Sequence, residues 1–494
     1  MRGEYVVSVR ERPVPLRRTA RSLGRYLIPI GVPVSLGMVL ALLTALLITR
    51  GRWVFALPLT SLVPAAILFN TYPFIGILLW FLISPYFQTT PTAIGRYFFW
   101  MVHRAMMPVA LVLSVVTIWI HRRERRFPRL TPAELAMFLY MALAVLSILL
   151  NPFNFTGRLY HLYDRVWIPF LAYLLIRYAQ PQRRDFGRFL PILIVTLLVE
   201  SVVGLMSWFV PSALPPEWLG LQGVRTTGTL ANPAVYTNTL IFSMVFLFHY
   251  AMHGRSATAR QGLLLLFGLG VVMIMLSFSR GSWLGCTLVL LGLLVLYPRV
   301  MLRLLLGTSV IMVILGSGLL SSQMAFASER LEDRHTTDAR IVEAYAALRM
   351  LAARPLLGWG YDSFDRYDRQ FVRRVAGIAV RKDDTSHNTY LTILAEMGGM
   401  GFILYVFPLL WWLYQSIRHF SRLPRGEPWG RRFLLVLWLA VLHYRVTTSF
   451  MDMRFFPFGS TLFWMELGFI GRQVARTWER RQDQRATPVL PAYR

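Results

Sequence analysis

The chain has 494 residues, of which 55% are hydrophobic and only 15% are charged. An average soluble domain carries about 25% charged residues, so this composition excludes an ordinary soluble enzyme and predicts a membrane protein. The net charge of +28 does not indicate nucleic-acid binding. Most of the arginines flank apolar segments, where they meet anionic lipid headgroups, and no basic stripe lies on a soluble domain. The single cysteine, Cys286, excludes an intramolecular disulfide.

Apolar runs long enough to cross a hydrocarbon core of about 30 Å recur along the whole chain. They lie near residues 27–48, 53–69, 72–87, 97–120, 133–150, 160–178, 188–210, 234–252, 262–279, 282–297, 300–320, 389–414, 433–450 and 455–471. The runs at 72–87 and 282–297 are short enough to be re-entrant or tilted. Since no alternating pattern of a lipid-facing barrel occurs, the predicted fold is an all-α integral membrane protein, a polytopic bundle of about 12–14 transmembrane helices.

The distribution of arginine orients this bundle. Cytoplasmic loops retain Lys and Arg, and the arginine clusters fall on alternate connections when the N-terminus is placed inside. Both termini are therefore expected in the cytoplasm. The expected organisation is a basic arm (1–26), an N-terminal transmembrane bundle (27–320), a helical outer-face loop (321–388), C-terminal transmembrane helices (389–474) and a cytoplasmic tail (475–494).

Polar motifs interrupt the apolar sequence, and the predicted topology places all of them on the outer face. In chain order they are Arg225-Thr-Thr-Gly-Thr-Leu-Ala-Asn-Pro, Ser279-Arg280-Gly-Ser-Trp, and Ser386-His387-Asn388 followed by Glu396-Met-Gly-Gly-Met-Gly. Two arginines and a histidine at the mouth of a helix bundle suit an enzyme that handles a lipid diphosphate better than they suit a pore.

The long outer loop is the part outside the membrane that is able to fold by itself. Residues 338–353 have apolar residues at helical spacing, with Asp338 as a possible N-cap. Gly358-Trp-Gly360 predicts a turn, and a second helical stretch is expected near 363–375. The loop is expected to cover the bundle mouth, with Arg225 and Arg280 beneath it.

Arginine is the residue best suited to hold a diphosphate leaving group. Its cation is permanent, and its planar fork matches two phosphate oxygens. Arg280 directly follows an apolar helix, at the depth of a lipid's diphosphate; alternatively it is an interfacial arginine that reaches for water. Arg225 binds the diphosphate or is a solvated loop charge. Arg340 serves the phosphate or pairs with Asp338 or Glu343.

His387 is the best candidate for a general base, since neutral imidazole can accept a proton from a sugar hydroxyl. Asp383 and Asp384 are close enough in sequence to orient it, and which of them does so is open. A histidine with a structural capping role is the alternative. Asn388 positions His387 or caps the following helix. The glycines after Glu396 are expected to permit close packing.

Charged residues inside predicted spans need partners, because an unpaired charge there is costly. They are Glu200, Glu396, Glu466, Arg104 and Arg445. A pair between Glu396 and Arg280 or Arg445 is one expectation. The remaining histidines have no metal-ligand spacing, and Asp383-Asp384 is adjacent rather than spaced, so no metal site is predicted.

These motifs together resemble the O-antigen ligase/polymerase family. The resemblance rests on Ser279-Arg280-Gly-Ser-Trp-Leu-Gly, Asp338-Ala-Arg340, Arg354-Pro-Leu-Leu-Gly-Trp-Gly360, and Ser386-His387-Asn388 with the Glu396 segment, and it extends over roughly residues 220–405. It implies a GT-C-like polytopic glycosyltransferase in the bacterial inner membrane. It also implies an undecaprenyl-diphosphate-linked glycan donor, a lipid-core or glycan acceptor, and inverting transfer without a metal or other cofactor.

Other functions remain open. A protein O-oligosaccharyltransferase of the same fold would share the donor half of the site. A small-anion transporter is a different class, which predicts symmetry between the two halves and broken helices at the membrane midplane. Neither feature is visible in the sequence, where the polar motifs cluster on one face.

Overall fold

The computed structural model describes residues 42–47, 49–51, 68, 72, 74–87, 92–120, 128–181, 183–220, 225–254, 256–317, 335–372, 386–425 and 429–486. The chain divides into two units, Met1–Tyr72 and Pro73–Arg494, and every element considered below belongs to the second. The predicted cytoplasmic arm and the span at 27–48 lie wholly or mostly outside the described residues, as do most of the span at 53–69 and the end of the tail.

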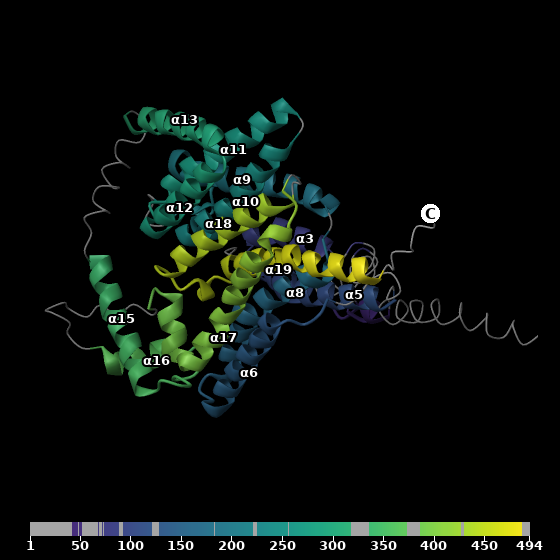
Figure 1. Cartoon of the computed structure of the whole chain (residues 1–494). Coiled ribbons are helices and arrows are strands. Elements are labelled where there is room, and N and C mark those ends of the chain that lie inside the picture. Colours follow the sequence, from purple (N-terminus) through teal and green to yellow (C-terminus); the bar gives the residue numbers. More distant parts are fainter. Residues whose placement is uncertain are drawn as a thin grey trace, which may run out of the picture. The chain divides into compact units, whose positions relative to one another are not determined.

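Within these ranges the chain is helical and forms no strand, which confirms the predicted all-α polytopic fold (Figure 1). Six of the described helices are long and apolar enough to cross a membrane, and two more are apolar but shorter. The elements are α3 (Ile75–Phe87), α4 (Ala93–Trp100), η1 (Met101–Met106), α5 (Met107–Ile120), α6 (Pro132–Leu150), α7 (Phe155–Leu162), η2 (Tyr163–Trp167), α8 (Ile168–Ala179), α9 (Arg183–Phe209), η5 (Gly228–Leu230), α10 (Pro233–His253), α11 (Ala257–Met275), α12 (Arg280–Leu296), α13 (Pro298–Ser317), α15 (His335–Ala353), α16 (Phe364–Phe371), α17 (Thr389–His419), α18 (Arg431–Thr448), η7 (Met453–Phe455) and α19 (Pro457–Ala486).

Side-chain caps begin several of these helices at residues that the sequence makes recognisable. Asn232 accepts hydrogen bonds from the first free N–H groups of α10, and Pro233 occupies the first helical position, where no donor is lost. Thr131 and Glu134 form a reciprocal capping box at the start of α6. These caps stop the chain from extending either helix further back, so they set where each apolar segment enters the bundle.

Helix α6 and the segment from α7 to α8 run in opposite directions, and contacts between their ends show it. At one end, Arg158 at the start of α7 donates a hydrogen bond to the carbonyl of Asn151, just after α6. At the other end, the guanidinium of Arg177 near the end of α8 lies 3.1 Å from the carboxylate of Glu134 near the start of α6. The first of these ends, where α6 and α18 finish and α7, α12 and α17 begin, is called the motif end below.

The outer loop contains the two helices that the sequence predicts, with different bounds. Helix α15 begins at His335, so Asp338 lies inside its first turn and the prediction of Asp338 as the N-cap is wrong. Helix α16 covers 364–371 of the predicted stretch 363–375, and residues 373–375 lie outside the described part. Both helices pack on α17, around a small core of Ala347, Met350, Phe364 and Ala395.

Candidate functional site

The segments that carry Arg225 and Arg280 meet at the turn between α11 and α12. The Arg225 Nε atom donates to the carbonyl of Ser277 over 3.3 Å, and the Thr226 N–H donates to the carbonyl of Leu276. Arg280 is the first residue of α12, a few residues further along the same turn. Both arginines are half-buried, so this turn carries two cations at the motif end.

A buried carboxylate holds the Arg225 segment in place. Glu200 of α9 accepts hydrogen bonds from the Thr229 N–H over 2.9 Å and from its hydroxyl over 2.6 Å. A Cβ at Gly228, where φ is +55°, would lie 1.9 Å from the same carboxylate, so only glycine fits there. The carboxylate of Glu200, which lies in a predicted membrane span, therefore anchors the loop that carries Arg225.

One short loop after α18 ties the Arg280 segment to the His387 segment. A Cβ at Gly281 would lie 2.9 Å from the ring of Phe450, so α12 and this loop are in close contact. The Asn388 side chain donates to the carbonyl of Ser449 over 3.1 Å. Thr389, the first residue of α17, donates to the carbonyl of Met451 over 3.2 Å. The predicted arginine and histidine motifs thus assemble at one end of the bundle.

His387 is held in an uncommon backbone conformation beside a helix cap. Its φ is +47°, in the left-handed region that few residues other than glycine adopt. Asn388 caps α17 by accepting hydrogen bonds from the N–H groups of Tyr390 and Leu391 over 2.9 and 3.1 Å. Of the two roles open for Asn388, the structure displays the cap. His387 as a whole is half-buried.

Strained residues gather in the same segments. Among the described residues, six other than glycine have positive φ, and Ala231, Phe278, Asp362 and His387 are four of them. Each lies in or next to a segment assembled at the motif end. Conformations of this kind cost of order 1–3 kcal/mol each and tend to cluster at functional sites.

Arg340 and the two aspartates complete the predicted set. Arg340 is half-buried on α15, the helix that packs against α17. Asp383 and Asp384 lie outside the described residues, so which of them orients His387 stays open.

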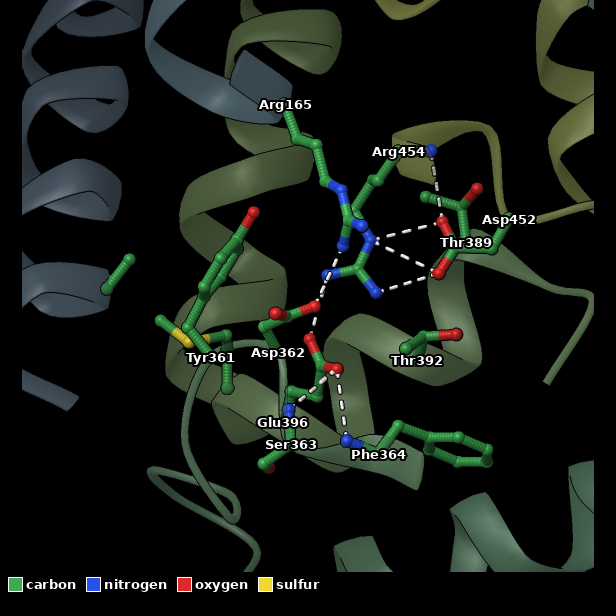
Figure 2. A network of polar contacts seen from close by, with 12 residues as sticks. Arg165, Tyr361, Asp362, Ser363, Phe364, Thr389, Thr392, Glu396, Asp452 and Arg454 are labelled. Carbon is green, nitrogen blue, oxygen red and sulfur yellow. Dashed lines mark hydrogen bonds and ion pairs between the residues drawn. The ribbon is translucent and has the colours of Figure 1, made fainter. Parts of the chain in front are cut away.

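The sequence analysis missed a central arginine, Arg454, in the loop between α18 and α19 (Figure 2). Its guanidinium lies 2.9 Å from the Glu396 carboxylate and 2.7 Å from that of Asp452. All three side chains are at least nine-tenths buried. The predicted pairing of Glu396 with Arg280 or Arg445 is wrong, because α17 presents Glu396 to the α18–α19 loop.

The same network fastens the outer loop to the bundle. The second Glu396 oxygen accepts hydrogen bonds from the N–H groups of Ser363 and Phe364, over 3.2 and 3.3 Å, at the start of α16 (Figure 2). Asp362, the residue before them, lies 2.8 Å from Arg165 and 2.6 Å from His161. Both of these partners belong to the α7–η2 segment of the bundle.

Electrostatics favour the charged forms of Asp452, Asp362 and Arg454 in this network. Burial by itself would raise the pKa of Asp452, but the Arg454 guanidinium outweighs burial and lowers it below its ordinary value. The pKa of Asp362 is likewise lowered in spite of burial, by the hydrogen bond to His161 and the charge of Arg165. Burial would lower the pKa of Arg454, yet Asp452 and Glu396 raise it well above its ordinary value.

Comparison with known families finds a match for the segment that carries most of these residues. Residues 264–406 match the family model described as O-antigen ligase. This segment is an O-antigen ligase domain. It contains Arg280, Arg340, His387 and Glu396, whereas Arg225 and Arg454 lie outside it. A search of curated proteins finds no match to the chain.

Two motifs of the O-antigen ligase domain bind each other through their backbones. The helix α17 is broken at Gly398, where φ is +63°. The Gly399 N–H donates to the carbonyl of Pro355 over 2.8 Å, and the Gly360 N–H donates to that of Glu396 over 2.7 Å. A Cβ at Gly398 would lie 2.4 Å from the backbone of Leu356. These glycines therefore let the loop and the broken helix approach each other.

The remaining charged residues of the predicted spans, Arg104, Arg445 and Glu466, lie outside this domain. Arg104 and Asp164 form a two-pronged ion pair between the π-helical turns η1 and η2, at 2.6 and 2.5 Å. The buried Arg445 guanidinium lies 4.0 Å from the ring of Phe463. Buried Glu466 lies on α19.

In the described part of the chain, which does not include Asp383 and Asp384, no group of three or more His, Cys, Asp or Glu side chains is arranged to hold a metal ion.

Proposed function

We propose that this O-antigen ligase-like membrane protein transfers a glycan from an undecaprenyl-diphosphate donor to an acceptor hydroxyl. The reaction would take place at the motif end, on the outer face of the inner membrane. The observation that carries the proposal is the loop at 449–451, which joins the segment with Arg280 to the segment with His387. Cations for a diphosphate and a base for a hydroxyl are thereby provided at one end of the bundle.

The donor's diphosphate would lie against the turn before α12. Arg225 and Arg280 supply permanent positive charge, and the N-terminus of α12 adds the partial positive charge of its free N–H groups. Such donors stabilise developing negative charge most strongly where water is partly excluded, and both arginines are half-buried. Arg340 on α15 would contribute from the loop side.

In the transfer step the acceptor oxygen attacks the anomeric carbon from the face opposite the diphosphate. A new C–O bond forms, and the bond from that carbon to the diphosphate oxygen breaks with inversion. The leaving diphosphate takes the electron pair and remains on the lipid. His387 takes up the hydroxyl proton.

The proposed acceptor is a lipid core or a glycan, which corresponds to ligation or polymerisation. A protein hydroxyl would use the same donor residues, so variants of these residues do not distinguish the three. Offering purified enzyme and labelled donor each acceptor class in turn distinguishes them directly, by which product carries the label.

Arg280→Lys is expected to lose most of the transfer activity although its charge is kept, because lysine lacks the planar fork that holds two phosphate oxygens. Transfer of labelled glycan by purified enzyme is the measurement, with folding checked by gel filtration in detergent. The matched control is Arg299→Lys, which should transfer normally. Arg299 is exposed and lies at the start of α13, beyond the opposite end of α12. Near-normal activity of Arg280→Lys would reduce Arg280 to an interfacial anchor.

Transfer is also expected to survive a chelator, because arginine supplies the charge neutralisation that a metal would otherwise provide. The measurement is the rate with and without EDTA, followed by addition of magnesium or manganese. Loss of activity with EDTA and recovery with either ion would contradict the proposal and direct attention to Asp383 and Asp384.

A further inference from the structure

Helix α15 exposes an apolar face. Ile341, Tyr345 and Leu348 recur at helical spacing on its outer side and are 46%, 39% and 51% exposed. The opposite side packs on the protein through buried residues such as Val342 and Ala346. The helix is therefore apolar on both of these sides.

No charged residue of α15 for which burial is described is as exposed as the residues of this face. Asp338, Arg340 and Arg349 are half-buried, and Glu343 is buried. A helix that borders water normally carries charged and polar residues on its outer face. The neighbouring helix α16 does so, since its exposed positions include Asp365, Arg366 and Arg369. The two helices of one loop thus present opposite chemistry to their surroundings.

The apolar surface continues from α15 onto a membrane-spanning helix. Leu356 and Leu357, in the turn after α15, are 70% and 51% exposed. The Met400 N–H of α17 donates to the carbonyl of Leu356 over 3.2 Å, so the turn lies directly against this helix. Met400 and Ile403 of α17 are themselves exposed, on a helix long and apolar enough to cross the membrane.

Arginines border this surface. The Arg349 guanidinium lies 4.2 Å from the Tyr345 ring and donates to its hydroxyl over 2.7 Å. The exposed Arg354 lies 4.1 Å from the Trp359 ring. Tyrosine, tryptophan and arginine beside an apolar strip are typical of segments that lie at the membrane surface, where cations meet lipid phosphates.

We infer that α15 lies in the headgroup layer of the membrane at the motif end, with Ile341, Tyr345 and Leu348 turned toward the acyl chains. Interfacial helices bury such a face about 5–10 Å into the boundary between headgroups and chains. Arg349 and Arg354 bind lipid phosphates from the border of the face. The outer loop is then held by the bilayer as well as by Glu396 and Arg454. The inference does not depend on the proposed glycosyl transfer.

Spin labelling of the full chain in lipid nanodiscs tests this placement. Cys286→Ala removes the buried native thiol, and a single nitroxide is attached at Leu348→Cys or, as the matched control, at Arg369→Cys on α16. Both positions are on the surface, so neither label disturbs the core. The measurement is the accessibility of each label to oxygen, which is enriched in lipid, and to a water-soluble nickel chelate.

The label at 348 is expected to be more accessible to oxygen than to nickel, with the ratio reversed at 369. Nickel accessibility at 348 equal to that at 369 would place the face in water and overturn the inference. Protection of 348 from both reagents, with broadening from a second spin label, would show that another copy of the chain covers the face and would overturn it equally.

Discussion

His387→Gln is expected to slow glycan transfer by about 10²–10⁴-fold, because an amide cannot take up the proton of the acceptor hydroxyl. Donor affinity should stay near that of the unchanged protein, since the proposed diphosphate site is formed by the arginines and not by the histidine. Single-turnover transfer and donor binding are measured in parallel on purified protein. The expected pattern is a loss of rate with binding retained.

The backbone at His387 calls for a second variant. Its φ of +47° is tolerated by asparagine better than by most residues, so His387→Asn separates loss of the base from strain in the loop. Both variants should be equally slow. His253→Gln, at the last residue of α10, is the matched control and should transfer normally. A normal rate for His387→Gln would leave Asp383 and Asp384 as candidate bases, because Glu396 is already engaged by Arg454.

Arg454→Met is expected to destabilise the protein by about 3–5 kcal/mol, because it leaves buried carboxylates without their cation. Glu396 and Asp452 both lie against this guanidinium, and both side chains are buried. The measurement is thermal unfolding in detergent. The attachment of α16 should loosen as well, since Glu396 holds its first N–H groups.

The control for loss of an arginine is Arg422→Met, which should change stability little. Arg422 is exposed and lies near the C-terminal end of α17. Adding Glu396→Gln to Arg454→Met should recover part of the loss, because one of the unpaired charges is then gone. Equal stability of Arg454→Met and Arg422→Met would show that the ion pair does not support the fold.

The helical bundle was predictable because the requirement of the membrane is local. Each crossing segment must be apolar over its whole length and must satisfy its own backbone groups, so the runs at 133–150 and 188–210 predict α6 and α9 to within a few residues. The first residue of α15 was harder to predict. Asp338 has the chemistry of a cap, but the helix begins three residues earlier, at His335.

The contacts of the site were predictable only in part, since they join residues far apart in the chain. Glu396 lies in an apolar span, so the sequence predicts that it needs a cation as its partner. The sequence does not predict which arginine is this partner, because Arg280, Arg445 and Arg454 have the same chemistry. The pairing of His161 with Asp362 spans 201 residues, and no local pattern marks it.

The turn at 355–360 is joined to the break in α17 by hydrogen bonds between main-chain groups, with glycines where the two backbones come closest. Side chains at positions such as Leu357 or Tyr367 can therefore change without undoing it, provided that the glycines remain. The side chains around this backbone contact can in this way be altered residue by residue while the contact itself stays constant. Related proteins are then expected to share the glycines and the main-chain hydrogen bonds and to differ in the side chains around them.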